Sequence, residues 1–190
     1  MKRVIIFASG SGSNAEKIVE YFKGHEEISV VKIMSNKAEA GVLARATRLG
    51  VPSEVFSKKQ MQEPGFVESL KAEADFIVLA GFLLKIPEAL IEAYPDKIIN
   101  IHPALLPKYG GKGMYGMNVH RAVVDNKETE SGISIHFVNA NYDEGAIIFQ
   151  ARTAVDPSDG PEEVAQKIHA LEYQYFPKVI EETIMNADAG

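Results

Sequence analysis

Short apolar segments alternate with amphipathic segments of helical period along most of this chain. Such alternation is typical of a parallel sheet with helices packed on its faces. The strands that it predicts are Val4–Ala8, Ile28–Met34, Val51–Phe56, Phe76–Ala80, Lys97–Ile101, Ser131–Val138 and Ala146–Val155. The last two flank a tight turn and should form an antiparallel hairpin. We therefore predict an α/β fold of three layers, with a mostly parallel sheet, helices on both faces and a late antiparallel hairpin.

Prolines and glycines indicate where the helices between these strands begin and end. Pro64, Pro87 and Pro161 stand where a first helical turn needs no N–H group, and Gly24 and Gly50 stand where helices should stop. The predicted helices are one through Ile18 and Phe22 to Gly24, then Ala40–Leu49, Pro64–Ala74, Pro87–Tyr94, His120–Asp125 and Pro161–Met185. A long glycine-rich segment from Pro103 to Met117 is expected to be a functional or mobile loop.

The composition of the chain narrows the classes of protein to consider. Its 190 residues, 46% of them apolar, suit one domain, which we place at residues 1–190. The chain has no cysteine, which excludes disulfides and thiolate metal sites. No apolar run approaches the ~20 residues that span a bilayer, and the net charge of −6 comes without a cationic cluster for nucleic acid. We therefore expect a cytoplasmic protein, a monomer or homodimer, that binds small molecules rather than a membrane or a nucleic acid.

A glycine- and serine-rich segment, Ser9–Asn14, joins the first strand to the first helix. Backbone N–H groups and the helix dipole make such a junction an anion site, and glycine lets the backbone approach the ligand. The alternative is a tight turn in which Ser13 or Asn14 only caps the helix. A dinucleotide is disfavoured because the third glycine of its motif is absent, and the Gly-Lys-Ser/Thr of an ATP-binding loop is absent too. The favoured ligand is therefore a single phosphate monoester.

Two polar side chains occupy the carboxyl end of the predicted fifth strand. Asn100 and His102 are two residues apart and should leave the same side of the strand, at the edge where open parallel sheets bind ligands. Asp143, in the turn of the late hairpin, can supply a carboxylate there. An amide, an imidazole and a carboxylate are suited to acyl transfer without a covalent nucleophile. Taken singly, His102 can equally be a structural residue and Asp143 a turn residue.

Other catalytic arrangements have less support. The chain lacks a Gly-x-Ser-x-Gly elbow, so a hydrolase of the triad type is not indicated. Asp143 and three histidines lack the ligand spacing of known metal sites, and we expect no metal; the histidines are His102, His120 and His136. We interpret His136 as an ordinary strand residue and His169 as a surface residue.

Four segments stand out as a set: Ser9-Gly10-Ser11-Gly12-Ser13-Asn14, Ala80-Gly81-Phe82, Asn100-Ile101-His102-Pro103-Ala104-Leu105-Leu106-Pro107 and Asp143-Glu144-Gly145. Together, in this order and spacing, they resemble the phosphoribosylglycinamide formyltransferase family of folate-dependent enzymes. The third segment is a highly specific signature of folate-dependent formyl transfer, whereas the first alone would be weak. The resemblance spans nearly the whole chain. It implies a Rossmann-like fold and transfer of a formyl group from 10-formyltetrahydrofolate to the amine of glycinamide ribonucleotide, a step of purine synthesis, without a metal.

The resemblance also implies roles for individual residues. Three residues of the glycine–serine segment would hold the phosphate of the ribonucleotide: Gly12, Ser13 and Asn14. Glu172 would contact the ribose or glycinamide part of the same substrate. Five residues would bind the folate: Leu83, Leu84, Lys85, Ile86 and Asn100. Three would be catalytic: Asn100, His102 and Asp143.

The chain departs from the family at two places. Leu84 stands where some relatives have an arginine, so pterin contacts there should run through backbone groups. Another arginine, which some relatives place before the third helix, has no clear counterpart near Glu63 and Pro64. In addition, the loop at residues 109–116 has no equivalent in the shorter family members, and its role is left open.

The implied mechanism is direct attack of the substrate amine on the formyl carbon. Asn100 and protonated His102 would stabilise the tetrahedral oxyanion. Asp143 would favour the charged imidazole and help to move a proton, through water, from the attacking amine to the leaving folate nitrogen.

Three alternatives stay open to test. A formyltetrahydrofolate deformylase uses similar residues with water as the nucleophile but carries an added amino-terminal domain, which a chain whose first strand starts at Val4 is not expected to contain. A methionyl-tRNA formyltransferase would need a further carboxyl-terminal domain. A non-catalytic nucleotide-binding module would explain the glycine–serine segment but not the set of Asn100, His102 and Asp143.

Overall fold

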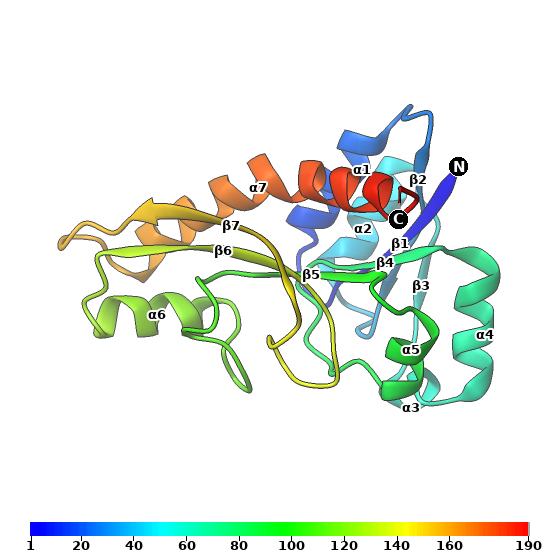
Figure 1. The fold of residues 1–190 in the computed structure, drawn as a ribbon, viewed down its shortest axis with the longest axis horizontal. Helices are drawn as coiled ribbons and strands as arrows, with labels where there is room; N and C mark the ends of the chain where they lie inside the picture. The colour runs from blue at the N-terminus through cyan, green and yellow to red at the C-terminus, as the bar shows by residue number, and fades with distance from the viewer. Residues whose placement is uncertain (190) are drawn as a thin grey trace.

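A computed structural model of the protein describes residues 1–189, and Gly190, the last residue of the predicted domain, lies outside it. Its centre is a seven-stranded sheet (Figure 1). The strands are β1 (Lys2–Phe7), β2 (Ile28–Ser35), β3 (Ser53–Val55), β4 (Phe76–Leu79), β5 (Ile98–His102), β6 (Glu130–Phe137) and β7 (Ile147–Ala154). The helices are α1 (Ser13–Phe22), α2 (Gly41–Leu49), α3 (Lys58–Met61), α4 (Pro64–Glu73), α5 (Glu88–Ala93), α6 (Met117–Asp125) and α7 (Pro161–Asn186).

The strand order is β3-β2-β1-β4-β5-β6-β7. Strands β1 to β5 pair in parallel, β6 pairs antiparallel with β5, and β7 pairs antiparallel with β6. The predicted mostly parallel sheet with a late hairpin is therefore confirmed. From β1 the chain builds outward to β2 and β3, and then returns to place β4 on the other side of β1. Open α/β sheets bind ligands at the carboxyl ends of the strands beside such a change of direction.

The central strands are buried on both faces, which their continuous apolar runs predict. In β1, Val4 and Ile6 face a core that includes residues of α1, α2, α6 and α7. Ile5 and Phe7 face a second core with residues of α3, α4 and α5. Helices therefore cover both faces of the sheet, and the predicted three layers are confirmed (Figure 1). None of the helices within residues 1–189 is long and apolar enough to cross a membrane.

Three features of the helices differ from the sequence-based expectations, and one of them is that α6 begins at Met117 rather than at His120. The short helix α3 was not predicted, although Ser57 and Gln60 exchange the hydrogen bonds of a capping box at its start. The alternative in which Ser13 or Asn14 caps α1 is wrong, because the capping position is Gly12, in a left-handed conformation with φ of 79°. At Gly12 a side chain would collide with Val42 of α2, so glycine allows α1 and α2 to pack closely.

Candidate active site

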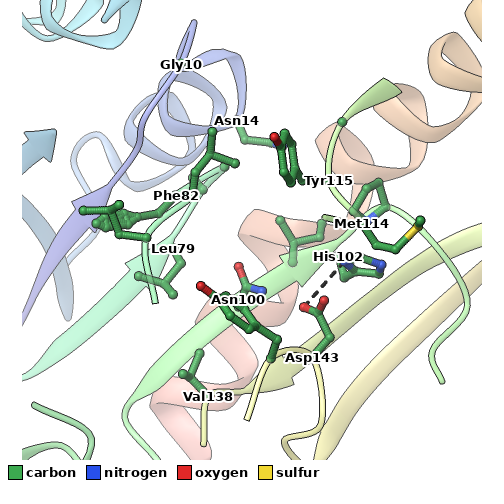
Figure 2. Close-up of a pocket in the computed structure, with 18 of the residues that line it drawn as sticks. Gly10, Asn14, Leu79, Phe82, Asn100, His102, Met114, Tyr115, Val138 and Asp143 are labelled. Atoms are coloured by element: carbon green, nitrogen blue, oxygen red, sulfur yellow. Dashed lines mark ion pairs between the residues drawn. The ribbon is translucent and has the colours of Figure 1, made fainter. Parts of the chain in front are cut away.

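A cavity of about 700 Å³ opens at the carboxyl ends of β1, β4 and β5. This volume is in the range of small-molecule sites. The cavity lies between the loop that precedes α1, the loop that follows β4, the end of β5 and the turn between β6 and β7 (Figure 2). Every residue predicted for the site lines it: Gly12, Ser13, Asn14, Leu83, Leu84, Lys85, Ile86, Asn100, His102, Asp143 and Glu172. The structure thus brings together segments that lie far apart in the sequence, while the role of each residue stays a prediction.

One end of the cavity is formed by the start of α1. The first-turn N–H groups donate no hydrogen bond to a capping side chain within the described chain, since the capping residue is Gly12. Such N–H groups, at the positive end of the helix dipole, can bind an anion. The glycine–serine segment therefore has the geometry of a phosphate site.

Beside the start of α1, a buried carboxylate is held by two neighbours. The Nδ2 group of Asn14 donates to Oε2 of Glu172 at 3.0 Å, and Nδ1 of His169 lies 3.0 Å from Oε1 of the same carboxylate. The bond to Glu172 raises the pKa of the His169 imidazole, although burial acts against it. The interpretation of His169 as a simple surface residue is therefore incomplete, because its half-exposed ring binds Glu172 and lines the cavity.

Two polar atoms at this end are buried and lack a hydrogen-bond partner within residues 1–189. They are Oδ1 of Asn14 and Nδ1 of His120, and both residues line the cavity. Burial without a partner costs free energy, which a bound polar ligand would recover. Burial also lowers the pKa of the His120 imidazole, with the nearby His169 ring acting in the same direction.

The opposite wall is the segment that follows β4. Ile86 is buried and Leu83 is 42% exposed, so this wall offers apolar surface to the cavity. The N–H group of Leu83 donates to Oγ of Ser9 at 3.0 Å, which fixes the segment to the end of β1. The Nζ atom of Lys85 lies 5.9 Å from the centre of the Tyr142 ring, a cation–π distance that joins this wall to the turn carrying Asp143.

Between the two ends lie the candidate catalytic groups (Figure 2). Asn100 and His102, both on β5, project to the same side because side chains alternate along a strand. Nδ1 of His102 lies 3.5 Å from Oδ1 of Asp143, and Nε2 of His102 lies 2.7 Å from the carbonyl oxygen of Tyr109. A carbonyl can only accept, so the proton of the neutral ring is on Nε2. As expected from the sequence, the Asp143 carboxylate lies next to the His102 ring.

The protonation states of this pair follow from burial and from their neighbours. Burial lowers the pKa of His102 below its ordinary value, and the Asp143 charge and the Tyr109 carbonyl raise it without outweighing burial. Burial alone would raise the pKa of Asp143, but the His136 ring 3.7 Å away, the His102 ring and the Gly111 N–H group together lower it. Asp143 thus favours the charged imidazole as predicted, but burial prevails, and the free protein favours neutral His102 beside a charged carboxylate.

His136, interpreted from the sequence as an ordinary strand residue, is a member of this group. It pairs with Asn100 across β5 and β6. Its Nδ1 lies 2.8 Å from the carbonyl oxygen of Phe137, so Nε2 is left as an acceptor, and Nδ2 of Asn100 lies 3.2 Å from it. The same Nε2 is 3.7 Å from Oδ1 of Asp143. The ring therefore orients the Asn100 amide, with one N–H bonded and the other available to a ligand.

Most of the loop at residues 109–116 also lines the cavity, from Gly111 to Gly116. Figure 2 shows two of its side chains, Met114 and Tyr115, among those around the cavity. Sequence reasoning noted this loop without assigning it to the site. Within residues 1–189 the structure contains no group of three or more His, Asp or Glu side chains arranged to hold a metal ion.

Comparison with known protein families gives one match, to a family described as formyl transferase, over residues 2–180. Among curated relatives, the chain is similar to a chloroplastic phosphoribosylglycinamide formyltransferase of Arabidopsis thaliana, with 41% identity over 94% of this chain and 64% of the relative. It is also similar to phosphoribosylglycinamide formyltransferase of Bacillus subtilis, with 36% identity over 97% of this chain and 95% of that protein. The chain spans about three-fifths of the plant relatives, at 64% and 60% of their lengths.

Solved structures agree with the match in sequence. Phosphoribosylglycinamide formyltransferase from Streptococcus pneumoniae superposes with a TM-score of 0.85 and 32% identity, over 97% of this chain and 99% of that one. The corresponding protein from Bacillus halodurans gives a TM-score of 0.86 and 32% identity, over 98% of this chain and 97% of that one. The Rossmann-like fold expected from the sequence is therefore confirmed.

Proposed function

Because the chain belongs to the formyl transferase family, we propose that it transfers a formyl group from 10-formyltetrahydrofolate to the amine of glycinamide ribonucleotide, in purine biosynthesis. The observation that carries the proposal is the position of Asn100, His102 and Asp143 between an anion site and an apolar wall of one cavity. With the catalytic groups between these two ends, the cavity suits a reaction between a phosphorylated amine and a flat, largely apolar formyl donor. Curated relatives that match this chain over most of its length bear the corresponding name.

The two ends of the cavity assign the two substrates. The ribonucleotide phosphate binds the main-chain N–H groups of Ser13 and Asn14, where Gly12 lets the backbone approach it. Glu172 lies close enough to Asn14 to accept hydrogen bonds from the ribose or glycinamide part. The pteridine ring of the folate binds against Leu83, Leu84, Lys85 and Ile86, and its formyl group reaches Asn100.

The amine attacks the formyl carbon and gives a tetrahedral intermediate with a negative oxygen. The N–H of Asn100 that is left for a ligand donates a hydrogen bond to that oxygen. The His102 ring donates a second one from Nδ1 once it has taken up a proton from bulk water, and it returns this proton when the intermediate collapses. Burial favours neutral His102 in the free protein, and the developing oxyanion adds negative charge that favours the imidazolium. Asp143, charged in the free protein, accepts the amine proton and passes it through water to the folate nitrogen as the carbon–nitrogen bond breaks. The electron pair of that bond stays on the leaving nitrogen.

An incubation with 10-formyltetrahydrofolate, with and without glycinamide ribonucleotide, tests the proposal. We expect loss of formyl folate and gain of formylated ribonucleotide in equal amounts, and only when both substrates are present. Folate turnover without the ribonucleotide would indicate hydrolysis by water instead. Binding of both compounds without turnover would indicate a non-catalytic nucleotide-binding protein.

A further inference from the structure

The first three residues of the loop at residues 109–116, Tyr109–Gly111, contact both His102 and Asp143 through main-chain atoms. The carbonyl oxygen of Tyr109 accepts a hydrogen bond from Nε2 of His102 at 2.7 Å. The N–H group of Gly111 donates to Oδ2 of Asp143 at 3.0 Å. Each bond uses one polar atom of the side chain and leaves the other, so that Nδ1 of His102 and Oδ1 of Asp143 face each other at 3.5 Å.

We propose that Tyr109–Gly111 is a main-chain clamp that sets the geometry of the His102–Asp143 pair, with Tyr109 and Gly110 as positioning residues. Asp143 needs an external restraint because it belongs to the turn after β6 and has a left-handed φ of 53°, a conformation that costs free energy for a residue other than glycine. The catalytic consequence of the clamp rests on the proposed function. The clamp itself is a property of the free protein.

Gly110 is required by space rather than by backbone conformation. A Cβ atom at this position would lie 2.6 Å from Cδ2 of Leu106 and 3.3 Å from Cβ of Asp143. The φ angle of Gly110 is not positive, so alanine can adopt the same backbone conformation. An alanine would therefore crowd Asp143 and the end of the Leu106 side chain, which is itself buried, without adding backbone strain.

Tyr109 holds the other half of the clamp. Its φ of 56° is also left-handed, and this conformation directs its carbonyl to His102. Its hydroxyl donates to Oε1 of Glu128 at 2.8 Å, a contact outside the cavity lining. The bond to Glu128 can therefore restrain Tyr109 from outside the site.

The test compares wild type, Gly110→Ala and Gly65→Ala. Gly65 lies in α4, outside the cavity lining, and within residues 1–189 nothing lies within 4 Å of a Cβ built there. The first readout is the titration of the His102 ring in the free protein, followed by NMR of labelled histidine. Burial lowers the pKa of this ring, and the groups around it are Asp143, Tyr109, Glu172, His136 and His120, of which the first three raise its pKa. Loosening the clamp weakens the contributions of Asp143 and Tyr109, so the His102 midpoint should move to lower pH in G110A and stay unchanged in G65A.

The second readout is steady-state kinetics with both substrates. We expect kcat of G110A to fall by about 10- to 100-fold, the size of loss that a small misplacement of reacting groups causes. Each KM should stay within about threefold, because neither substrate is assigned to Gly110.

An unchanged His102 midpoint in folded G110A overturns the clamp, whatever happens to kcat. If G110A does not fold, Tyr109→Phe decides, since it removes only the hydroxyl: a lower midpoint supports the clamp, and a wild-type midpoint overturns it. Absence of formyl transfer by the wild type would refute the proposed function and leave the titration result standing.

Discussion

The parallel part of the sheet, β1 to β4, and the mixed part, β5 to β7, build their sides of the cavity from different chemical groups. On the parallel side these are the main-chain N–H groups at the start of α1 and the apolar segment after β4. On the mixed side they are buried side chains that can gain or lose protons, joined to one another around Asp143. Fixed dipoles suit a phosphate, whose charge does not change during the reaction. An oxyanion that forms during the reaction needs hydrogen-bond donors already placed around it. We therefore expect the parallel side to govern substrate affinity and the mixed side to govern the rate of the chemical step.

Removal of His102 should give the largest effect and tests the mixed side directly. His102→Ala deletes a donor to the oxyanion, a loss of about 2.7–4 kcal/mol, or about 100- to 1000-fold in kcat. The KM for the ribonucleotide should change little, because the phosphate is held at the other end of the cavity. Steady-state kinetics with each substrate varied in turn measure both quantities.

His25→Ala is the matched control for His102→Ala. His25 lies against Glu181, outside the cavity lining, so its loss should affect stability and leave kcat in place. If H102A kept its kcat and raised KM for the ribonucleotide, the division between the two sides would be wrong.

A crowded glycine on the parallel side should give the next largest effect. Gly12→Ala forces a side chain against Val42 in a left-handed conformation, a strain of about 1–3 kcal/mol. The resulting shift of the loop should raise KM for the ribonucleotide by about tenfold and leave kcat at saturation within about threefold. The measurement is KM for the ribonucleotide together with the unfolding midpoint in urea.

Gly24→Ala is the control for Gly12→Ala. Gly24 has a similar φ of 77°, and among residues 1–189 no atom lies within 4 Å of a Cβ built there. Gly24→Ala reproduces the backbone strain of Gly12→Ala away from the cavity, so the stability of the fold should decrease while KM for the ribonucleotide stays constant. A loss confined to kcat in G12A would place the start of α1 in the chemical step rather than in binding.

The two sides also differ in how far the sequence predicts them. On the parallel side, strand–turn–helix units follow one another, and glycine or proline near their ends predicts the order of the elements and the anion site. Even the missed helix α3 had a local signal in Ser57 and Gln60. Their places at a strand end and in the hairpin turn, together with the resemblance, predicted the three catalytic candidates, Asn100, His102 and Asp143. The surroundings of these residues on the mixed side depend on tertiary structure.

Two groups on the mixed side show why the sequence does not predict the contacts around the catalytic candidates. His136 joins the site because it stands opposite Asn100, and that register is set by the pairing of β5 with β6 rather than by any local pattern. The Tyr109 carbonyl is a main-chain group that every residue possesses, and only the left-handed conformation of Tyr109 directs it to His102. The pattern of residue types indicates neither the register that places His136 opposite Asn100 nor the backbone conformation of Tyr109.

A smaller effect is expected where the apolar wall meets the turn that carries Asp143. Lys85→Ala removes the cation from the Tyr142 ring, a contact worth about 0.5–1 kcal/mol when exposed. The KM for formyl folate should rise by about two- to fivefold, with little change in kcat. Lys97→Ala provides a matched control, because Lys97 lies at the same 5.9 Å from the Phe76 ring and outside the cavity lining. An equal change of KM in both variants would show that the effect is not specific to this wall.

The smallest effect should be found where the two sides meet, at Glu172 between Asn14 and His169. The bond to Glu172 raises the pKa of His169, so protonated His169 stabilises the folded protein fully below its unfolded pKa of about 6.5, and this contribution is lost as pH rises through the folded value. Because the ring is half-exposed, solvent screening limits it to about 0.5 kcal/mol. Urea unfolding of wild type and His169→Gln should therefore differ at about pH 5.5 and converge at about pH 9. A difference that grew with pH would mean that His169 binds Glu172 as a neutral ring, and the junction would then be a neutral hydrogen bond rather than an ion pair.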